Sequence, residues 1–161
     1  MSRFCTTHRA PRAGIDPIVD PASALAVIRL AISWPAEAET VVLVLDPDRR
    51  GRTVVVVQGT RYDDDVVEVV ERFAEAIAWE IEDMAAGASP AGMIVASVRP
   101  GRGPEPADAD RWLEAGAVAE TFGVELIEWF VLEAHGGDDH DRFTAWCPRD
   151  LLAEPPRWHP S

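Results

Sequence analysis

Two short runs of β-branched residues constrain this chain most strongly. Residues 40–46 read TVVLVLD and residues 53–58 read TVVVVQ, and the polar link between them contains Pro47 and Gly51. β-Branched residues favour strands, and a short polar link of this kind favours an antiparallel hairpin. Both runs are apolar at almost every position instead of alternating. We therefore expect both faces of their sheet to be covered, which predicts helices on each side.

Helices are predicted before and after this hairpin. Asp20 followed by Pro21 is typical of a helix start, and Pro35 prevents that first helix from continuing. Apolar residues recur every three or four positions from residue 63 to about residue 86, which predicts a long amphipathic helix. Its other side is acidic, and we interpret that side as a solvated face.

The second half of the chain repeats a strand and a helix before a last strand. Residues 92–98 and 124–133 are predicted to be buried strands. Between them, a loop rich in proline and glycine leads into a helix that we expect Asp108 or Asp110 to cap. The residues expected on the inward side of this helix are Trp112, Leu113, Ala115 and Ala119.

The predicted order of elements is helix, strand, strand, helix, strand, helix, strand. This order indicates an α/β protein, a layered α-β-α sandwich with a mixed sheet. A length of 161 residues suits a single domain. We divide the chain into an N-terminal arm (1–18), the domain (19–134) and a C-terminal extension (135–161).

The end of the chain shows weaker patterning. From Phe143 onward the pattern weakens, and Pro155, Pro156 and Pro160 lie near the end, so we predict an extended tail. Trp146 and Trp158 in this region are candidates for anchoring a partner.

The charge balance excludes some classes of partner. Fifteen basic residues against 28 acidic residues give a net charge of -13, which disfavours direct binding of nucleic acid and of anionic membranes. The N-terminus lacks an apolar leader, and no later apolar run is long enough to span a bilayer. We expect a cytoplasmic protein, in which Cys5 and Cys147 are free thiols.

Catalytic and metal-binding motifs are not evident. The sequence contains no GxSxG, P-loop, HExxH or GxGxxG motif, so nucleophilic catalysis has no candidate and no cofactor is expected. The histidines and cysteines do not follow a zinc-finger spacing, and we expect no metal site from them. These residues are Cys5, His8, His135, His140, Cys147 and His159.

The segment MIVASVRPGRGPEPADADRWLEAGAVAETFGVELIEWFVL resembles the central part of the RadC-type JAB (MPN) domains, whose active members are zinc hydrolases. In that family an apolar strand leads into HNHPSG, a proline-rich loop, and a helix that begins with Ser and Asp. Here Pro100, Pro104 and Pro106 match the loop prolines, Asp110 matches a metal-ligand aspartate, and Gly123 matches a glycine before the next strand. The resemblance extends from residue 20 to residue 132 and implies the JAB/MPN (cytidine-deaminase-like) architecture.

The residues that carry the family's chemistry are replaced. Ser97 and Arg99 stand where the family has its two metal-binding histidines, and Ala107 stands where it has a serine that supports the oxyanion. A hydroxyl and a fixed cation cannot substitute for two neutral imidazoles as zinc ligands. Ser97, Arg99, Ala107 and Asp110 are therefore relic metal-site positions, and we expect Arg99 to occupy the vacated space and pair with Asp110.

Two further family positions also differ. The general-base glutamate aligns with Ala38, although Glu37 or Glu39 would take its place after a shift of one residue. The family's Asp-His pair in the last strand becomes Glu128 and Trp129. A glutamate without a metal does not activate water as the family does.

Our interpretation from these residues is a catalytically inactive RadC-like JAB-fold domain that acts as a protein-interaction or assembly module, with self-association or a protein partner expected. The alternative is a hydrolase with a relocated active site near Asp110 and Arg99, assisted by Glu37 or Glu39. Arg99 and Arg102 could also bind an anion. The relocated site requires a pocket beside an accessible Arg99.

Overall fold

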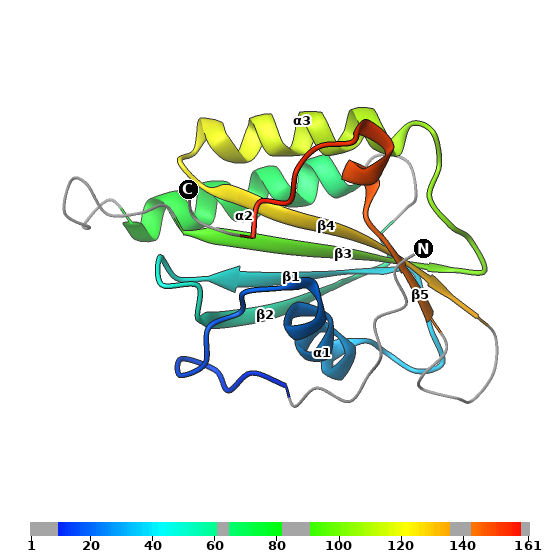
Figure 1. The fold of residues 1–161 in the computed structure, drawn as a ribbon, viewed down its shortest axis with the longest axis horizontal. Helices are drawn as coiled ribbons and strands as arrows, with labels where there is room; N and C mark the ends of the chain where they lie inside the picture. The colour runs from blue at the N-terminus through cyan, green and yellow to red at the C-terminus, as the bar shows by residue number, and fades with distance from the viewer. Residues whose placement is uncertain (1–9, 61–64, 82–90, 136–142, 159–161) are drawn as a thin grey trace.

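The helices and strands follow one another largely in the predicted order, with one further strand and a short 3-10 helix near the end (Figure 1). The computed structural model describes residues 10–60, 65–81, 91–135 and 143–158. None of the helices in these ranges is long and apolar enough to cross a membrane. The elements are α1 (Pro21–Ala31), β1 (Glu39–Leu45), β2 (Gly51–Gln58), α2 (Asp65–Ile81), β3 (Gly92–Pro100), α3 (Asp108–Thr121), β4 (Glu125–Ala134), β5 (Phe143–Trp146) and η1 (Pro148–Leu152).

The strands form one mixed sheet in the order β2-β1-β3-β4-β5. β1 is antiparallel to both β2 and β3, β4 runs parallel to β3, and β5 is antiparallel to β4. A parallel pair needs a crossover connection, and α3 supplies the one between β3 and β4. The predicted hairpin, the α/β class and the mixed sheet are confirmed.

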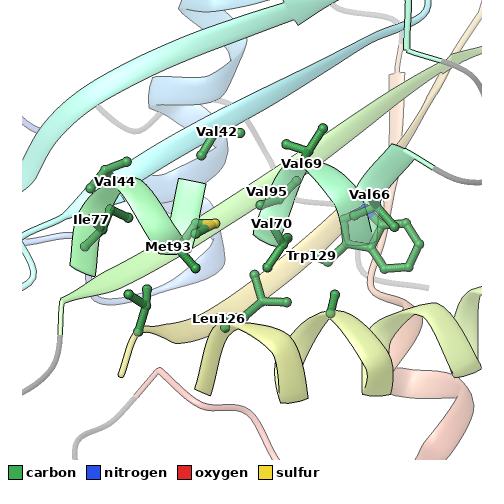
Figure 2. Packing of buried hydrophobic residues seen from close by; sticks show 14 of the residues in the cluster. Val42, Val44, Val66, Val69, Val70, Ile77, Met93, Val95, Leu126 and Trp129 are labelled. Carbon is green, nitrogen blue, oxygen red and sulfur yellow. The ribbon is translucent and has the colours of Figure 1, made fainter. Parts of the chain in front are cut away.

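Helices pack against both faces of this sheet. Apolar residues of α2 and α3 share one buried cluster with alternate residues of β1, β3 and β4, and those of α1 share a second cluster with the other residues of the same strands. Figure 2 shows part of the first cluster, in which Val70 of α2 lies with Val95 of β3 and Trp129 of β4. This alternation decides which side of the sheet each polar residue of β1 and β3 faces.

The expected covering of both hairpin strands is wrong for β2. All seven residues of β1 are buried, but Arg52, Thr53 and Val54 of β2 are exposed and the valines after them are half-buried. β2 has a neighbour on one side only, because it ends the sheet. The apolar run of β2 therefore does not mean that its side chains are buried.

The expectation of an extended tail from Phe143 is also wrong. Phe143 pairs with Ala134 and Trp146 pairs with Val131, so this segment adds a strand to the sheet. Trp158 is 6% exposed and lies in the α1-side cluster, which contradicts its assignment as an anchor for a partner. A four-residue strand is too short to show a period.

The two helix starts differ in how they are capped. Asp20 caps α1 as predicted, since its side chain accepts a hydrogen bond from the Ser23 backbone N–H at 2.7 Å. At α3 the prediction is wrong, because the cap position is Ala107 and Asp108 is already the first helical residue. Leu113, expected inside, is 46% exposed.

Candidate functional site

The C-terminal end of β3 meets the first turn of α3, and a buried ion pair joins them. The Arg99 guanidinium donates from Nη1 to Oδ2 of Asp108 at 2.7 Å and from Nη2 to Oδ1 at 2.9 Å. The side chain of Arg99 is 3% exposed and that of Asp108 is fully buried. Two parallel bonds between a guanidinium and a carboxylate form the most directional ion pair that proteins make.

Further donors complete the coordination of this carboxylate. Arg111 donates to Oδ1 of Asp108 at 2.7 Å, and the Glu105 backbone N–H donates to Oδ2 at 2.6 Å. Burial by itself would raise the pKa of Asp108, but the bonds from Arg99, Glu105 and Arg111 outweigh it and hold the pKa below its ordinary value. Asp108 is therefore an ionised, buried anion between two cations.

The expected pairing of Arg99 with Asp110 is wrong. Arg99 pairs with Asp108, whereas Asp110 is exposed on the first turn of α3. Residues two apart on an α-helix point in roughly opposite directions, because each step turns about 100°. Asp108 therefore faces the sheet, and Asp110 faces away from Arg99.

Ser97 lies on the same side of β3 as Arg99, two residues earlier, and its hydroxyl is engaged by Trp129. The Trp129 Nε1–H donates to Ser97 Oγ at 2.9 Å. The guanidinium carbon of Arg99 is 5.8 Å from the centroid of a Trp129 ring, a distance at which a cation is attracted to the ring face. Trp129 thus contacts both Ser97 and Arg99.

The glutamates considered as general bases lie elsewhere. Glu39 pairs in register with Val98, and Ser97 pairs with Thr40, so Glu39 faces the α1 side of the sheet and Ser97 faces the other side. Glu39 is 1% exposed and accepts bonds from the Ser33 N–H at 2.7 Å and the Ser33 hydroxyl at 2.9 Å. Glu37 is exposed. The structure brings neither carboxylate to Arg99.

Ala107 and Arg102, the remaining residues singled out from the sequence, lie on the surface of the loop before α3. Both are exposed. Arg102 is held near Arg99 through the backbone, where its N–H donates to the Arg99 carbonyl at 3.2 Å. The Arg99 guanidinium itself is buried against Asp108, so the two arginines do not present a joint surface for an anion.

A second buried charge cluster was missed from the sequence. Glu128 of β4 is fully buried and accepts bonds from Arg149 Nε to both carboxylate oxygens, at 2.9 and 2.8 Å, and from Trp158 Nε1 at 3.2 Å. Cys147 is a free thiol, as expected, and burial raises its pKa, as does the adjacent charge of Glu128. An acidic residue inside an apolar strand is the one sequence signal for such a cluster, since a buried carboxylate needs a partner.

Comparisons with known proteins add no assignment. No family model, curated protein or solved structure matches the chain. Among the described residues, no group of three or more His, Cys, Asp or Glu side chains is placed to hold a metal ion. His135 contacts Thr144 at 2.9 Å, and Cys5, His8, His140 and His159 lie outside the described residues.

Surface pockets are present, but they lie away from the Arg99–Asp108 pair. One of about 270 Å³ lies at the start of β4 and is lined by residues that include Gly116, Glu120 and Arg157. Another of about 130 Å³ lies beside β2, against Ile18 and Val54. Neither has Ser97, Arg99 or Asp108 in its lining.

Proposed function

We propose that this chain is a catalytically inactive domain of the RadC-like JAB (MPN) type that serves in protein interaction or assembly. The support from architecture is the sequence of elements between residues 20 and 132. The helix, the hairpin, the long helix and the strand-helix-strand unit stand in the order that the resemblance implies. The support from chemistry comes from the end of β3.

The observation that carries this proposal is the buried Arg99–Asp108 pair. In the related zinc hydrolases the resemblance places a histidine at position 99, and here that position holds a permanent cation fixed by two bonds. A divalent cation placed beside it would be repelled, and the low local dielectric would strengthen that repulsion. The remaining candidate ligand, Asp110, faces away.

The alternative of a relocated hydrolase site receives no comparable support. Arg99 is 3% exposed and its Nη atoms donate to Asp108 and to the Gly103 carbonyl, so both Nη atoms are engaged within the protein. Glu39 lies on the other face of the sheet, bonded to Ser33. A general base and an electrostatic stabiliser must both reach one substrate atom, and these side chains do not converge.

Metal analysis of the purified protein tests the proposal. We expect dialysis against excess zinc, followed by removal of free metal, to leave far less than one zinc per chain. Asp110→Asn is the diagnostic variant, and Asp48→Asn, at an exposed residue of the β1–β2 turn, is its matched control. One zinc per chain that is lost in Asp110→Asn and retained in Asp48→Asn would overturn the proposal.

Light scattering tests the proposed role in protein interaction or assembly. An assembly module should form a defined oligomer or a stable complex with a recoverable partner. A strict monomer at all concentrations, for which no partner can be found, would count against this role alone.

A further inference from the structure

The two edges of the sheet differ in how they are protected. β5 has only four residues. The part of β4 beyond β5 is covered by the C-terminal segment, from which Arg157 donates to the Leu126 carbonyl at 3.2 Å. β2, in contrast, is eight residues long and ends the sheet on the other side. An exposed edge of this length is where sheets add another strand.

Among the described residues, the segment 11–18 lies beside the first half of β2, where Pro11, Arg12 and Ala13 line a pocket together with Thr53 and Val54. The Gly14 N–H donates to the Gly51 carbonyl at 3.0 Å, and the Ile18 N–H donates to the Arg49 carbonyl at 2.7 Å. Beyond this point the run Thr53 to Val57 contains no proline and no charge. Proteins that remain monomeric usually place lysine, proline or a bulge on such an edge; the register irregularity of β2 lies at Arg52, before this run.

We infer that β2 pairs with β2 of a second copy of this chain, antiparallel and about a two-fold axis, to make one continuous ten-stranded sheet. The inference deepens the proposed assembly function, on which it rests, by naming the partner and the surface. Two identical strands related by a two-fold axis necessarily run antiparallel in one sheet, so the interface is self-complementary.

The side-chain pattern of β2 favours a register centred on Val55. Val55 pairs with Val42 of β1 and Val54 pairs with Leu43, so from Thr53 to Gln58 the odd-numbered residues face α2 and the even-numbered residues face α1. Before Thr53 the register shifts, and Arg52 contacts Glu80 of α2. In this register Val54 lies opposite the second copy's Val56, and Val55 lies opposite itself. Cross-strand pairs of β-branched residues stabilise antiparallel sheets.

The charges of the edge strand itself do not oppose its pairing with a second copy. Each chain carries a net charge of -13, but the stretch from Gly51 to Thr60 contains no acidic residue. In the Val55-centred register Arg52 lies opposite the neutral Gln58, so like charges do not meet. Arg52 of each copy also pairs with Glu80 of its own α2 at 3.7 Å, so the two paired strands bring no unbalanced charge directly opposite one another.

The size of the edge sets the expected strength of this contact. In this register seven residues a side, Arg52 to Gln58, oppose one another, which is below the 20 to 30 residues of a standard stable interface. We therefore expect a reversible dimer, with a dissociation constant on the order of ten micromolar.

Sedimentation velocity on the full chain, from about 1 to about 200 µM, tests the inference across that range. We expect a concentration-dependent dimer for the wild type and a monomer for Val54→Lys and for Thr53→Lys. The matched control is Leu30→Lys on α1, since Leu30 is 78% exposed, and it should still dimerise. All three variants add one positive charge and so reduce the overall repulsion between chains equally. Loss of the dimer in the β2 variants alone would therefore result from the change at the β2 edge.

Circular dichroism and a thermal melt accompany each variant to show that it is folded. A wild type that stays monomeric at the highest concentration overturns the inference. So does a dimer that persists in both folded β2 variants, because the contact would then lie on another surface. Heterologous pairing with another protein's strand, with no dimer of this chain, also overturns it.

Cysteine crosslinking tests the register. In a Cys5→Ser background, Val55→Cys should form a disulfide-linked dimer under mild oxidation, because residue 55 faces itself across the axis. Val57→Cys should crosslink much less, since residue 57 faces Thr53. The opposite result overturns the Val55-centred register. Zinc binding that depends on Asp110 would overturn the proposed inactive function and leave these dimer measurements unchanged, so the two failures are distinguishable.

Discussion

Replacing Arg99 with methionine removes the charge that neutralises Asp108 while keeping most of the side-chain volume. Asp108 is fully buried, so water cannot replace the two lost bonds. Breaking a buried ion pair by removing one partner typically costs about 3 to 5 kcal/mol. Arg111 and the Glu105 N–H still donate to the carboxylate, so we expect about 3 kcal/mol, at the lower end of this range.

A second substitution separates the charge from the packing. In Arg99→Met/Asp108→Leu both charges are absent, and such paired apolar replacements are often neutral or even stabilising. The double variant should therefore be more stable than Arg99→Met alone. Arg72→Ala is the surface control, because Arg72 and Glu68 are both exposed and such pairs contribute less than about 1 kcal/mol.

Urea unfolding followed by circular dichroism measures these differences, and a thermal melt should show Arg99→Met lower by about 6 to 12 °C. The pH dependence gives an independent check. The pKa of Asp108 is lowered in the folded protein, so its stabilising contribution is present above its ordinary pKa and is lost as the pH falls through the lowered value. Without Arg99 that pKa rises, and the difference between wild type and variant should shrink as the pH falls toward 4.

The reasoning about the buried pair is refuted by either of two results. One is a loss of less than about 1 kcal/mol in Arg99→Met, which would mean that Asp108 is hydrated or otherwise compensated. The other is a double variant as unstable as the single one, which would mean that lost packing, and not an uncompensated charge, sets the cost.

Two further predictions concern the C-terminal segment. Trp158→Ala should destabilise the protein by about 3 to 5 kcal/mol in urea unfolding, whereas Trp79→Ala, at a residue that is 70% exposed, should change stability by less than about 0.5 kcal/mol; equal effects would mean that residues after β5 are not part of the core. In a Cys5→Ser variant, Cys147 should react with a thiol reagent only after unfolding, because burial and Glu128 raise its pKa; rapid labelling of the folded protein would contradict this.

Local patterns in the sequence were sufficient for most of the helices and strands. The capped start of α1, the hairpin and the apolar period of α2 depend on neighbouring residues, whose backbone preferences act over a few positions. β5 escaped prediction because its stability comes from pairing with β4. The exposed β2 misled prediction because an edge strand and a central strand can carry the same valine run.

The candidate site was only partly predictable. The sequence predicted a carboxylate partner for Arg99, since a guanidinium at the end of a buried strand needs a carboxylate. It did not distinguish Asp108 from Asp110, because the choice depends on where α3 begins, and the structure starts the helix one residue earlier than a cap at Asp108 would require.

By itself the sequence determined the α/β class and the hairpin, because these follow from residue type and short-range order. Only the tertiary structure decided which carboxylate Arg99 binds, that Glu39 lies on the opposite face, and that Arg149 and Trp158 neutralise and cover Glu128. These contacts join residues on different elements. The direction of each side chain depends on strand register and helix phase, which form only when the sheet and helices pack together.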